Sequence, residues 1–523
     1  MKALSVLYHG RPGVDKAASA AANADSLAAV TRFPGTEKIV FLGQEGASHP
    51  PLPPGAELIC RPAWTRKSLM ESLSVVSAGY DFLYFACADC PLLDPALAAA
   101  LAERHTRYGA EYSYADGWPY GFAPELLNPQ TAGILAKFAE DDESRVERDA
   151  IFQLIQKDIN AFDIETEIST VDLRPYRLSL TADSRRNRLL LSRFSENGLT
   201  SAADAEKLLS ERPEAVAKTA MLRTLPAFFN IQVTGACPQT CSLCPWPAYS
   251  SRPVTECSEH MAAADFEKLL DKIVEFAGDA VIDLSLWGEP AMHPQKIELV
   301  EMVLRRPGLS LIIETSGIGW KEEELKALAA SASSAKPREN GMAALSWVVS
   351  LDAHDPERYK ELRGSGFSEA KSTAKTLFSL FPKDTYVQAV RVKDSEDDIE
   401  QFYRYWKAEQ PERAGASHVI IQKYDDFAGN LPKRQATDLS PVKRRPCWHI
   451  MRDMNILLDG SVPSCREDLG ALKGEPAAGL WGNAFSDNLA DIWERGSALY
   501  LEHCKAEYRG ICALCDEYYT YNF

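Results

Sequence analysis

The sequence predicts an α/β protein made of two successive α/β regions and a small cysteine-rich region at the C-terminal end. Three observations lead to this prediction. Short apolar runs alternate with helical patterns over residues 3–200, a second alternation runs over 225–432, and five of the twelve cysteines follow residue 446. Such alternation is typical of parallel sheets with helices packed on them. At 523 residues the chain exceeds the size of one hydrophobic core, so we expect two to four domains.

The first region, residues 1–200, is predicted to be a single α/β domain. Helical patterns cover residues 14–30 and 94–109. The apolar runs predicted to be strands are residues 3–9, 38–43, 56–61 and 82–88. A polar stretch at 201–224 is predicted to link this domain to the next one.

The second region, residues 225–436, is predicted to be a partial (β/α)6 barrel of the TIM type. Its strand-like runs are residues 228–234, 280–287, 309–317, 344–353, 385–392 and 417–425. Each of the first five is followed by a helical segment, for example 264–278 and 395–410. In such barrels the chemistry takes place at the C-terminal ends of the strands.

Composition and charge exclude several classes of protein. The net charge of −17 disfavours general nucleic-acid binding, because an acidic chain repels phosphate backbones. No apolar run approaches the roughly 18 residues that span a bilayer. The first residues lack a basic segment followed by an apolar one, so we expect no signal peptide and a cytoplasmic protein. In a reducing cytoplasm, clustered thiols indicate metal ligation rather than disulfides.

Three cysteines, Cys237, Cys241 and Cys244, directly follow the first strand of the predicted barrel. Their spacing lets one tight loop present three thiolates to one centre. Soft thiolates favour iron–sulfur clusters, copper(I) or zinc. A [4Fe–4S] cluster normally takes four protein ligands, so three would leave one iron open to a small molecule. The alternative is a structural zinc site with a distant fourth ligand.

The C-x3-C-x2-C spacing after a first barrel strand resembles the signature of the radical S-adenosylmethionine (SAM) superfamily. The resemblance implies that the amino and carboxylate groups of SAM bind the open iron of a [4Fe–4S] cluster. The reduced cluster then cleaves SAM to a 5′-deoxyadenosyl radical, which abstracts hydrogen from a substrate. Leu243 departs from the pattern, because many members have an aromatic residue there.

Polar motifs at the ends of the next four strands also resemble this family, in the expected order. The resemblance implies SAM contacts from Trp287, Gly288, Glu289 and Pro290, then Glu314 and Thr315, then Ser350 and Asp352, and finally Gln388 and Arg391. Two of these assignments have alternatives. Asp352 is also a candidate cap of the following helix. Gln388 and Arg391 lie three positions apart, so a regular strand cannot point both inward.

The last region, residues 437–523, is predicted to be a small metal-stabilised domain. The Asp459-Gly460 pair predicts a hairpin turn, which would bring Cys447 and Cys465 toward one end. These cysteines and the final C-x2-C resemble the SPASM or twitch extensions of radical SAM enzymes. The resemblance implies one auxiliary [4Fe–4S] cluster on Cys447, Cys465, Cys512 and Cys515, with Cys504 left over. A zinc ribbon is the alternative, because its cysteine spacing is similar.

The N-terminal domain resembles sugar nucleotidyltransferases, especially the spore-coat-type cytidylyltransferases, at 85–95, 109–112 and 177–183. This resemblance implies a nucleotidyltransferase-like Rossmann-type fold and makes Asp89 a candidate Mg²⁺ ligand. The triphosphate loop of those enzymes is not matched, because the chain offers only Arg11, Gly13 and Lys16 there. We therefore expect lost or altered activity. The combination of regions resembles the spiro-SPASM proteins.

From these resemblances we expect a radical SAM enzyme that acts on a peptide or protein and receives electrons from a flavodoxin or ferredoxin. Two alternatives remain open: a nucleotide-sugar-modifying enzyme whose N-terminal domain binds the substrate, and a non-catalytic interaction protein stabilised by zinc. The sequence assigns no residue to the reaction of the substrate.

Overall fold

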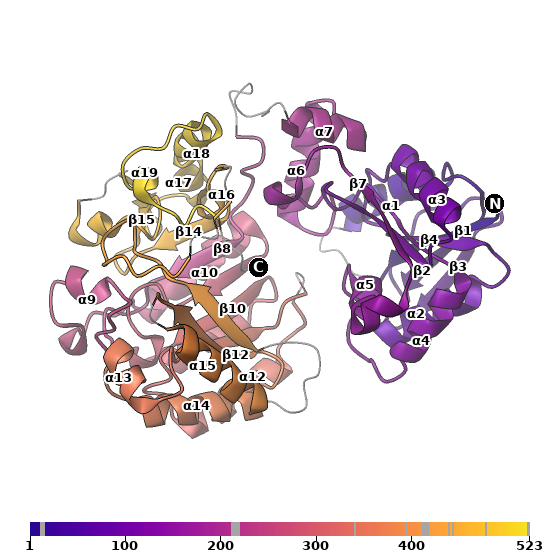
Figure 1. Cartoon of the computed structure of the whole chain (residues 1–523). Coiled ribbons are helices and arrows are strands. Elements are labelled where there is room, and N and C mark those ends of the chain that lie inside the picture. The colour runs from indigo at the N-terminus through magenta and orange to yellow at the C-terminus, as the bar shows by residue number, and fades with distance from the viewer. Residues whose placement is uncertain are drawn as a thin grey trace. The chain divides into compact units, whose positions relative to one another are not determined.

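The computed structural model describes residues 1–10, 16–210, 220–338, 341–393, 395–409, 418–437, 440–441, 444–475 and 479–519. The chain divides into two compact units, Met1–Val216 and Ala217–Phe523 (Figure 1). No helix within the described ranges is long and apolar enough to cross a membrane.

Unit 1 is built on a seven-stranded sheet in the order β3-β2-β1-β4-β6-β5-β7. All neighbouring strands are parallel except β6, which runs antiparallel to β4 and β5. The strands are β1 (Ala3–His9), β2 (Thr36–Gln44), β3 (Glu57–Arg61), β4 (Phe82–Cys87), β5 (Tyr112–Asp116), β6 (Glu125–Leu127) and β7 (Ile164–Ile168). The helices are α1 (Lys16–Val30), α2 (Arg66–Val76), α3 (Pro95–Tyr108), α4 (Pro129–Phe138), α5 (Ala150–Ile155), α6 (Arg185–Glu196) and α7 (Ala202–Ser210).

Unit 2 is built on a second seven-stranded sheet, in the order β13-β12-β11-β10-β9-β8-β14, and every neighbouring pair is parallel. The first six strands in chain order are β8 (Phe228–Ile231), β9 (Ala280–Asp283), β10 (Leu309–Thr315), β11 (Leu345–Ser350), β12 (Thr385–Arg391) and β13 (Val419–Lys423). The helices between them are α9 (Trp246–Tyr249), α10 (Ala263–Ala277), α11 (Lys296–Leu304), α12 (Glu322–Ser334), α13 (Pro356–Arg363), α14 (Phe367–Leu380) and α15 (Glu396–Ala408). The predicted α/β fold class, with a partial (β/α)6 barrel, is confirmed.

The C-terminal segment of the chain packs within unit 2. Its elements are β14 (Asp453–Ile456), β15 (Ser461–Pro463), β16 (Leu480–Asn483), α16 (Trp448–Arg452), α17 (Leu489–Arg495), α18 (Ser497–Cys504) and α19 (Ile511–Leu514). The predicted turn forms at Gly460, which has a φ of 84°. The strands on its two sides join different sheets, because β14 pairs with β8 while β15 pairs with β16. Strand β14 thus extends the barrel sheet, while a small C-terminal domain over residues 437–523 stays a prediction.

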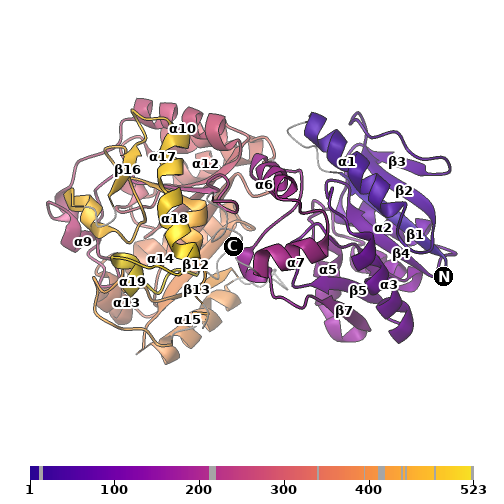
Figure 2. The ribbon, with the colours of Figure 1, turned by 90° about the horizontal axis from the view of Figure 1, so that it is seen from above.

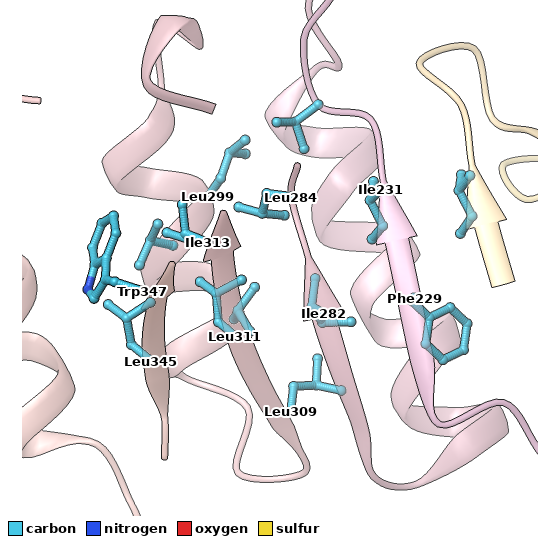
Figure 3. Packing of buried hydrophobic residues seen from close by; sticks show 14 of the residues in the cluster. Phe229, Ile231, Ile282, Leu284, Leu299, Leu309, Leu311, Ile313, Leu345 and Trp347 are labelled. Atoms are coloured by element: carbon cyan, nitrogen blue, oxygen red, sulfur yellow. The ribbon is translucent and has the colours of Figure 1, made fainter. Parts of the chain in front are cut away.

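Helices cover the outer side of the barrel strands (Figure 2). Helix α10 shows why: Phe266, Leu269, Leu270 and Ile273 recur at the spacing of one helical face, and all four are buried. Side chains on alternate strand positions meet these helices. Figure 3 shows this layer, with Leu299 of α11 beside the apolar residues of β8 to β11. Because side chains alternate along a strand, the intervening positions face the interior of the barrel, where the chemistry is expected.

Candidate active site and cysteine clusters

The loop after β8 holds three of the cysteines in place through backbone hydrogen bonds. The Cys237 amide donates to Val254 O at 3.0 Å, and the Ser242 amide donates to Leu362 O at 2.8 Å. The Trp246 indole donates to Gly235 O at 3.0 Å and closes the base of the loop. The loop is therefore fixed to the segment before α10 and to the end of α13.

The thiols of this loop suit metal ligation. Burial raises the pKa of Cys237 and Cys241 and raises that of Cys244 to about 12. The negative charges of Cys241 and Cys244 also raise the pKa of Cys237, so the three thiols interact electrostatically. Buried thiolates without a counter-charge are costly, and a cationic iron centre would supply that charge.

One cavity of about 240 Å³ opens beside this loop at the C-terminal ends of the barrel strands. All three loop cysteines line it. Of the residues that the sequence assigned to SAM, the cavity is lined by Trp287, Gly288, Glu289, Glu314, Thr315, Ser350 and Gln388. Residues from β9, β10, β11 and β12 therefore meet the cysteine loop, as expected for strand ends in a barrel.

The segment after β9 comes so close to the cysteine loop that it requires a glycine. Gly288 has a φ of 95°, and a Cβ atom there would lie 2.1 Å from Thr234 O. The next residue, Glu289, accepts hydrogen bonds from Thr315 Oγ1 at 2.5 Å and from the Ser316 amide at 2.7 Å. Glu289 is only 3% exposed, so its main observed role is to join the ends of β9 and β10.

A row of polar side chains crosses the cavity on three neighbouring strands. Glu314 Oε1 accepts hydrogen bonds from Ser350 Oγ at 3.0 Å and from Gln388 Nε2 at 2.8 Å. Ser350 and Gln388 are buried, whereas Glu314 is exposed. This arrangement holds an accessible carboxylate in a fixed position, and it suits a ligand that carries a cationic or hydroxyl group.

Asp352 lies outside the set of residues that line the cavity. Its fully buried carboxylate pairs with Arg363 Nε at 2.5 Å and accepts the Val390 amide at 2.7 Å. It does not cap the following helix, because Asp355 caps α13. Arg363 lines the cavity, so the observed contacts make Asp352 a partner of Arg363 rather than of a ligand.

Arg391 and Pro290 also lie outside the cavity lining. Arg391 pairs with Glu396 at 2.8 Å on the surface, where its side chain is 37% exposed. Gln388 lines the cavity and Arg391 does not, because side chains three positions apart on a strand point to opposite faces. The observed geometry thus gives no support to a SAM contact from Arg391.

The cavity contains charged residues that the sequence analysis did not identify, among them Asp283, Arg363, Lys423 and Arg466. Asp283 ends β9, and burial, followed by the charge of Glu314, raises its pKa to about 7. The alternation along β9 could have indicated Asp283, since Ile282 faces the helices. No local signal indicates Arg363, because its partner lies eleven residues away.

Four of the five C-terminal cysteines come from three segments of the chain and interact electrostatically with one another. Cys447 precedes α16, Cys465 follows β15, and Cys512 and Cys515 lie at α19. Burial raises the pKa of all four thiols, and the charge of Cys447 acts on both Cys465 and Cys515. The charge of Cys512 acts in turn on Cys447. Cys504 packs in the hydrophobic core.

The four-cysteine group borders the cavity through the residues next to its cysteines. Arg466 follows Cys465, lines the cavity and pairs with Asp425 at 3.3 Å. Lys423 lines the cavity from β13 and pairs with Asp516 and Glu517, which follow Cys515, at 2.8 and 2.7 Å. The cysteines of this group are not among the residues that line the cavity.

The distances between sulfur atoms can be compared with those of a zinc site, which is the alternative for both cysteine groups. A tetrahedral zinc ion with Zn–S bonds of about 2.3 Å needs its sulfur atoms about 3.8 Å apart. Among the described residues, neither cysteine group has three ligand atoms that all lie within 4.8 Å of one another. The spacing of the described side chains therefore does not by itself define a zinc site in either group.

In unit 1, Asp89 follows β4 as expected from the sequence. Both of its carboxylate oxygens accept hydrogen bonds from Arg148. Arg11 and Gly13 lie outside the described residues, and so does the side chain of Lys16.

Comparison with known proteins identifies the central part of the chain. Residues 231–405 match the family described as the Radical SAM superfamily, so the chain contains a radical SAM domain. An uncharacterized protein of Treponema pallidum (strain Nichols) is 38% identical over 382 residues, which cover 71% of this chain and 98% of that protein. The chain belongs to the same family as this Treponema protein.

Several solved structures share a limited likeness with the chain. Streptococcus suis SuiB bound to precursor peptide SuiA has a TM-score of 0.40 and 15% identity, over 71% of this chain and 83% of that one. BtrN in complex with AdoMet and 2-DOIA has a TM-score of 0.37 and 17% identity, over 56% and 92%. A likeness at this level does not identify a substrate.

Proposed function

We propose that this protein reductively cleaves SAM and uses the resulting radical to take a hydrogen atom from a substrate. The observation that carries the proposal is the shared cavity of the cysteine loop and the polar row of Glu314, Ser350 and Gln388. When bound by the three cysteines, a [4Fe–4S] cluster supplies the electron for SAM cleavage, which is chemistry of the cofactors rather than of the side chains.

The tasks of the chain are to bind, orient and exclude water. Cys237, Cys241 and Cys244, which line the cavity, would hold the cluster through three of its irons and leave one iron without a protein ligand. The accessible carboxylate of Glu314 suits the amino group of SAM, because charge-assisted hydrogen bonds are strong. Ser350 and Gln388 fix the position of that carboxylate.

Glu289 acts in this proposal as a positioning residue for the same ligand. Its bonds to Thr315 and Ser316 keep two strand ends together beside the loop. Trp287 and Gly288 bring their backbone to the cavity at positive φ. Arg363, held by Asp352, supplies a fixed positive charge near Cys241.

The group of Cys447, Cys465, Cys512 and Cys515 is proposed to hold an auxiliary [4Fe–4S] cluster. Four thiols complete the ligands of such a cluster, so its role would be electron transfer or structure. We propose a peptide or protein substrate and a flavodoxin or ferredoxin as electron donor, because the C-terminal cysteines resemble those of SPASM extensions.

The proposal is tested with full-length protein purified without oxygen, reduced with dithionite and mixed with SAM. The expected products are 5′-deoxyadenosine and methionine, and SAM should alter the EPR signal of the reduced cluster. A Cys237→Ala/Cys241→Ala/Cys244→Ala variant should lose both effects.

Cys257→Ala is the matched control, because Cys257 lies near the loop but outside the cavity lining, with its sulfur 3.3 Å from Ser250 Oγ. It should behave as the wild type. If the wild-type cluster is reduced and SAM changes neither its EPR signal nor the products, the proposed function is wrong.

A further inference from the structure

Two aspartates of unit 1 lie together at the C-terminal end of its central strands. Asp89 follows β4, and Asp183 precedes α6. The Ala182 amide donates a hydrogen bond to the backbone oxygen of Asp89 at 2.9 Å, so the two segments are fixed side by side. Paired carboxylates at such a strand end are a common place for a divalent cation bound to nucleotide phosphates.

The guanidinium group of Arg148 lies between these two carboxylates. Its Nη1 donates to Asp89 Oδ1 at 3.0 Å, and its Nη2 donates to Asp89 Oδ2 at 2.5 Å and to Asp183 Oδ2 at 2.6 Å. The three side chains are only 16%, 13% and 25% exposed for Arg148, Asp89 and Asp183. The contact with Asp89 is bidentate, which is the strongest form of such a pair.

The remaining carboxylate oxygen of Asp183 is also occupied. Asp183 Oδ1 accepts hydrogen bonds from Thr181 Oγ1 at 2.7 Å and from Asn187 Nδ2 at 2.9 Å. Burial acts to raise the pKa of Asp183, but Arg148 and these hydrogen bonds outweigh it and lower the pKa to about 2. The aspartate is therefore a stable anion whose charge is already compensated.

The ring of Tyr120 completes the surroundings of Arg148, with its centroid 5.2 Å from the guanidinium carbon. A Mg²⁺ ion requires a near-octahedral set of oxygen ligands at about 2.0–2.1 Å. Each oxygen of Asp89 and Asp183 already has a donor from the chain, and the guanidinium would repel a second cation. These residues do not fit a Mg²⁺ ion.

We infer that Arg148 holds the place of a divalent cation between Asp89 and Asp183, so that this edge of the sheet in unit 1 binds no metal–nucleotide complex. This inference is independent of the radical SAM chemistry proposed for unit 2. A nucleotidyltransferase reaction at Asp89 would depend on that metal. The ion pairs of Arg148 with Asp89 and Asp183 occupy its place at this edge of the sheet.

The test counts Mn²⁺ ions bound to the full-length holoprotein, by the loss of the EPR signal of free Mn²⁺. We compare the wild type with Asp89→Asn, with Arg148→Ala and with the Arg148→Ala/Asp89→Asn double variant. The wild type and Asp89→Asn should bind equal numbers of ions. Arg148→Ala should bind one more, and the double variant should lose that ion again.

Arg66→Ala is the matched control, because Arg66 is a similarly buried partner of a single carboxylate, Asp142, at 2.8 Å. It should gain no ion. The inference is overturned if the wild type binds an ion that Asp89→Asn loses, or if folded Arg148→Ala gains none. If Arg148→Ala fails to fold, the numbers of Mn²⁺ ions bound by the wild type and by Asp89→Asn decide the question. A second measurement then compares the affinity of the wild type for CTP with and without Mg²⁺, and we expect equal affinities.

Discussion

The two cysteine groups of unit 2 differ in how the chain presents its thiols. The loop group places three cysteines within eight residues, and all three line the cavity. The C-terminal group collects four cysteines from segments spread over about seventy residues, and none of them lines it. Three thiols would leave one iron of a [4Fe–4S] cluster open to a ligand, whereas four thiols would leave none.

The charges around the two groups differ as well. Near the loop, Arg363 lowers the pKa of Cys241 against the effect of burial. Near the C-terminal group, the carboxylate of Glu467 adds to burial in raising the pKa of Cys465 and Cys515. Under the proposed function, cavity access and ligand number would separate an open metal centre from a closed one within the same fold.

The largest effect is expected from the replacement of one loop cysteine. Cys241→Ala should abolish SAM cleavage, because the open cluster needs all three thiols, while the C-terminal cluster stays in place. The measurement is the iron and sulfide content together with the yield of 5′-deoxyadenosine. Full activity in Cys241→Ala would break the distinction between the two groups.

The ion pair beside the loop should matter for stability. Arg363→Met leaves Asp352 buried and unpaired, which should lower the free energy of unfolding by about 3–5 kcal/mol. Arg391→Met is the control, since its exposed pair with Glu396 contributes about 0–1 kcal/mol. The midpoints of anaerobic urea denaturation measure the loss of stability in each of the two variants. Equal midpoints would show that the pair does not support the loop.

The cavity carboxylate should contribute to binding rather than to folding. Glu314→Gln removes a charge that suits the SAM amino group, so we expect SAM affinity to fall by about 1.5–3 kcal/mol. Isothermal titration of the anaerobic holoprotein measures this. Glu323→Gln is the control, because Glu323 is exposed on α12, away from the cavity lining. Equal affinities in the two variants would contradict the role of Glu314.

The smallest effect concerns pH. The pKa of Asp283 is raised to about 7, so the folded chain keeps a proton that the unfolded chain loses above about pH 4. Stability should therefore fall as pH rises toward 7, by about 1–2 kcal/mol between pH 5 and 7, and Asp283→Asn should lack that part of the decline. Thermal unfolding midpoints of both proteins at pH 5 and 7 provide the measurement. Parallel declines would show that Asp283 keeps no extra proton.

Much of the fold and of the loop site is local in the sequence. Strand β1 forms at residues 3–9 as predicted, and the spacing of Cys237, Cys241 and Cys244 needs only one loop. The period of the strands also places Glu314 and Gln388 at the barrel interior. Such features follow from neighbouring residues, so they can be predicted without the fold.

Other features depend on residues that are distant in the sequence. The pairing of β14 with β8 joins segments more than two hundred residues apart, and it carries the C-terminal cysteines to the barrel. Arg148 meets Asp89 from a position 59 residues away. Neither contact has a local pattern, because both depend on packing of the complete unit.

The central claim is that one cysteine group holds an open cluster and the other a closed one. The most direct test is iron analysis and EPR of reduced protein with and without SAM, in the wild type and in Cys512→Ala/Cys515→Ala. We predict about eight irons in the wild type and about four in the variant, with a signal that SAM still alters in both. A variant whose remaining signal no longer responds to SAM, or zinc in place of iron in both proteins, would contradict the account.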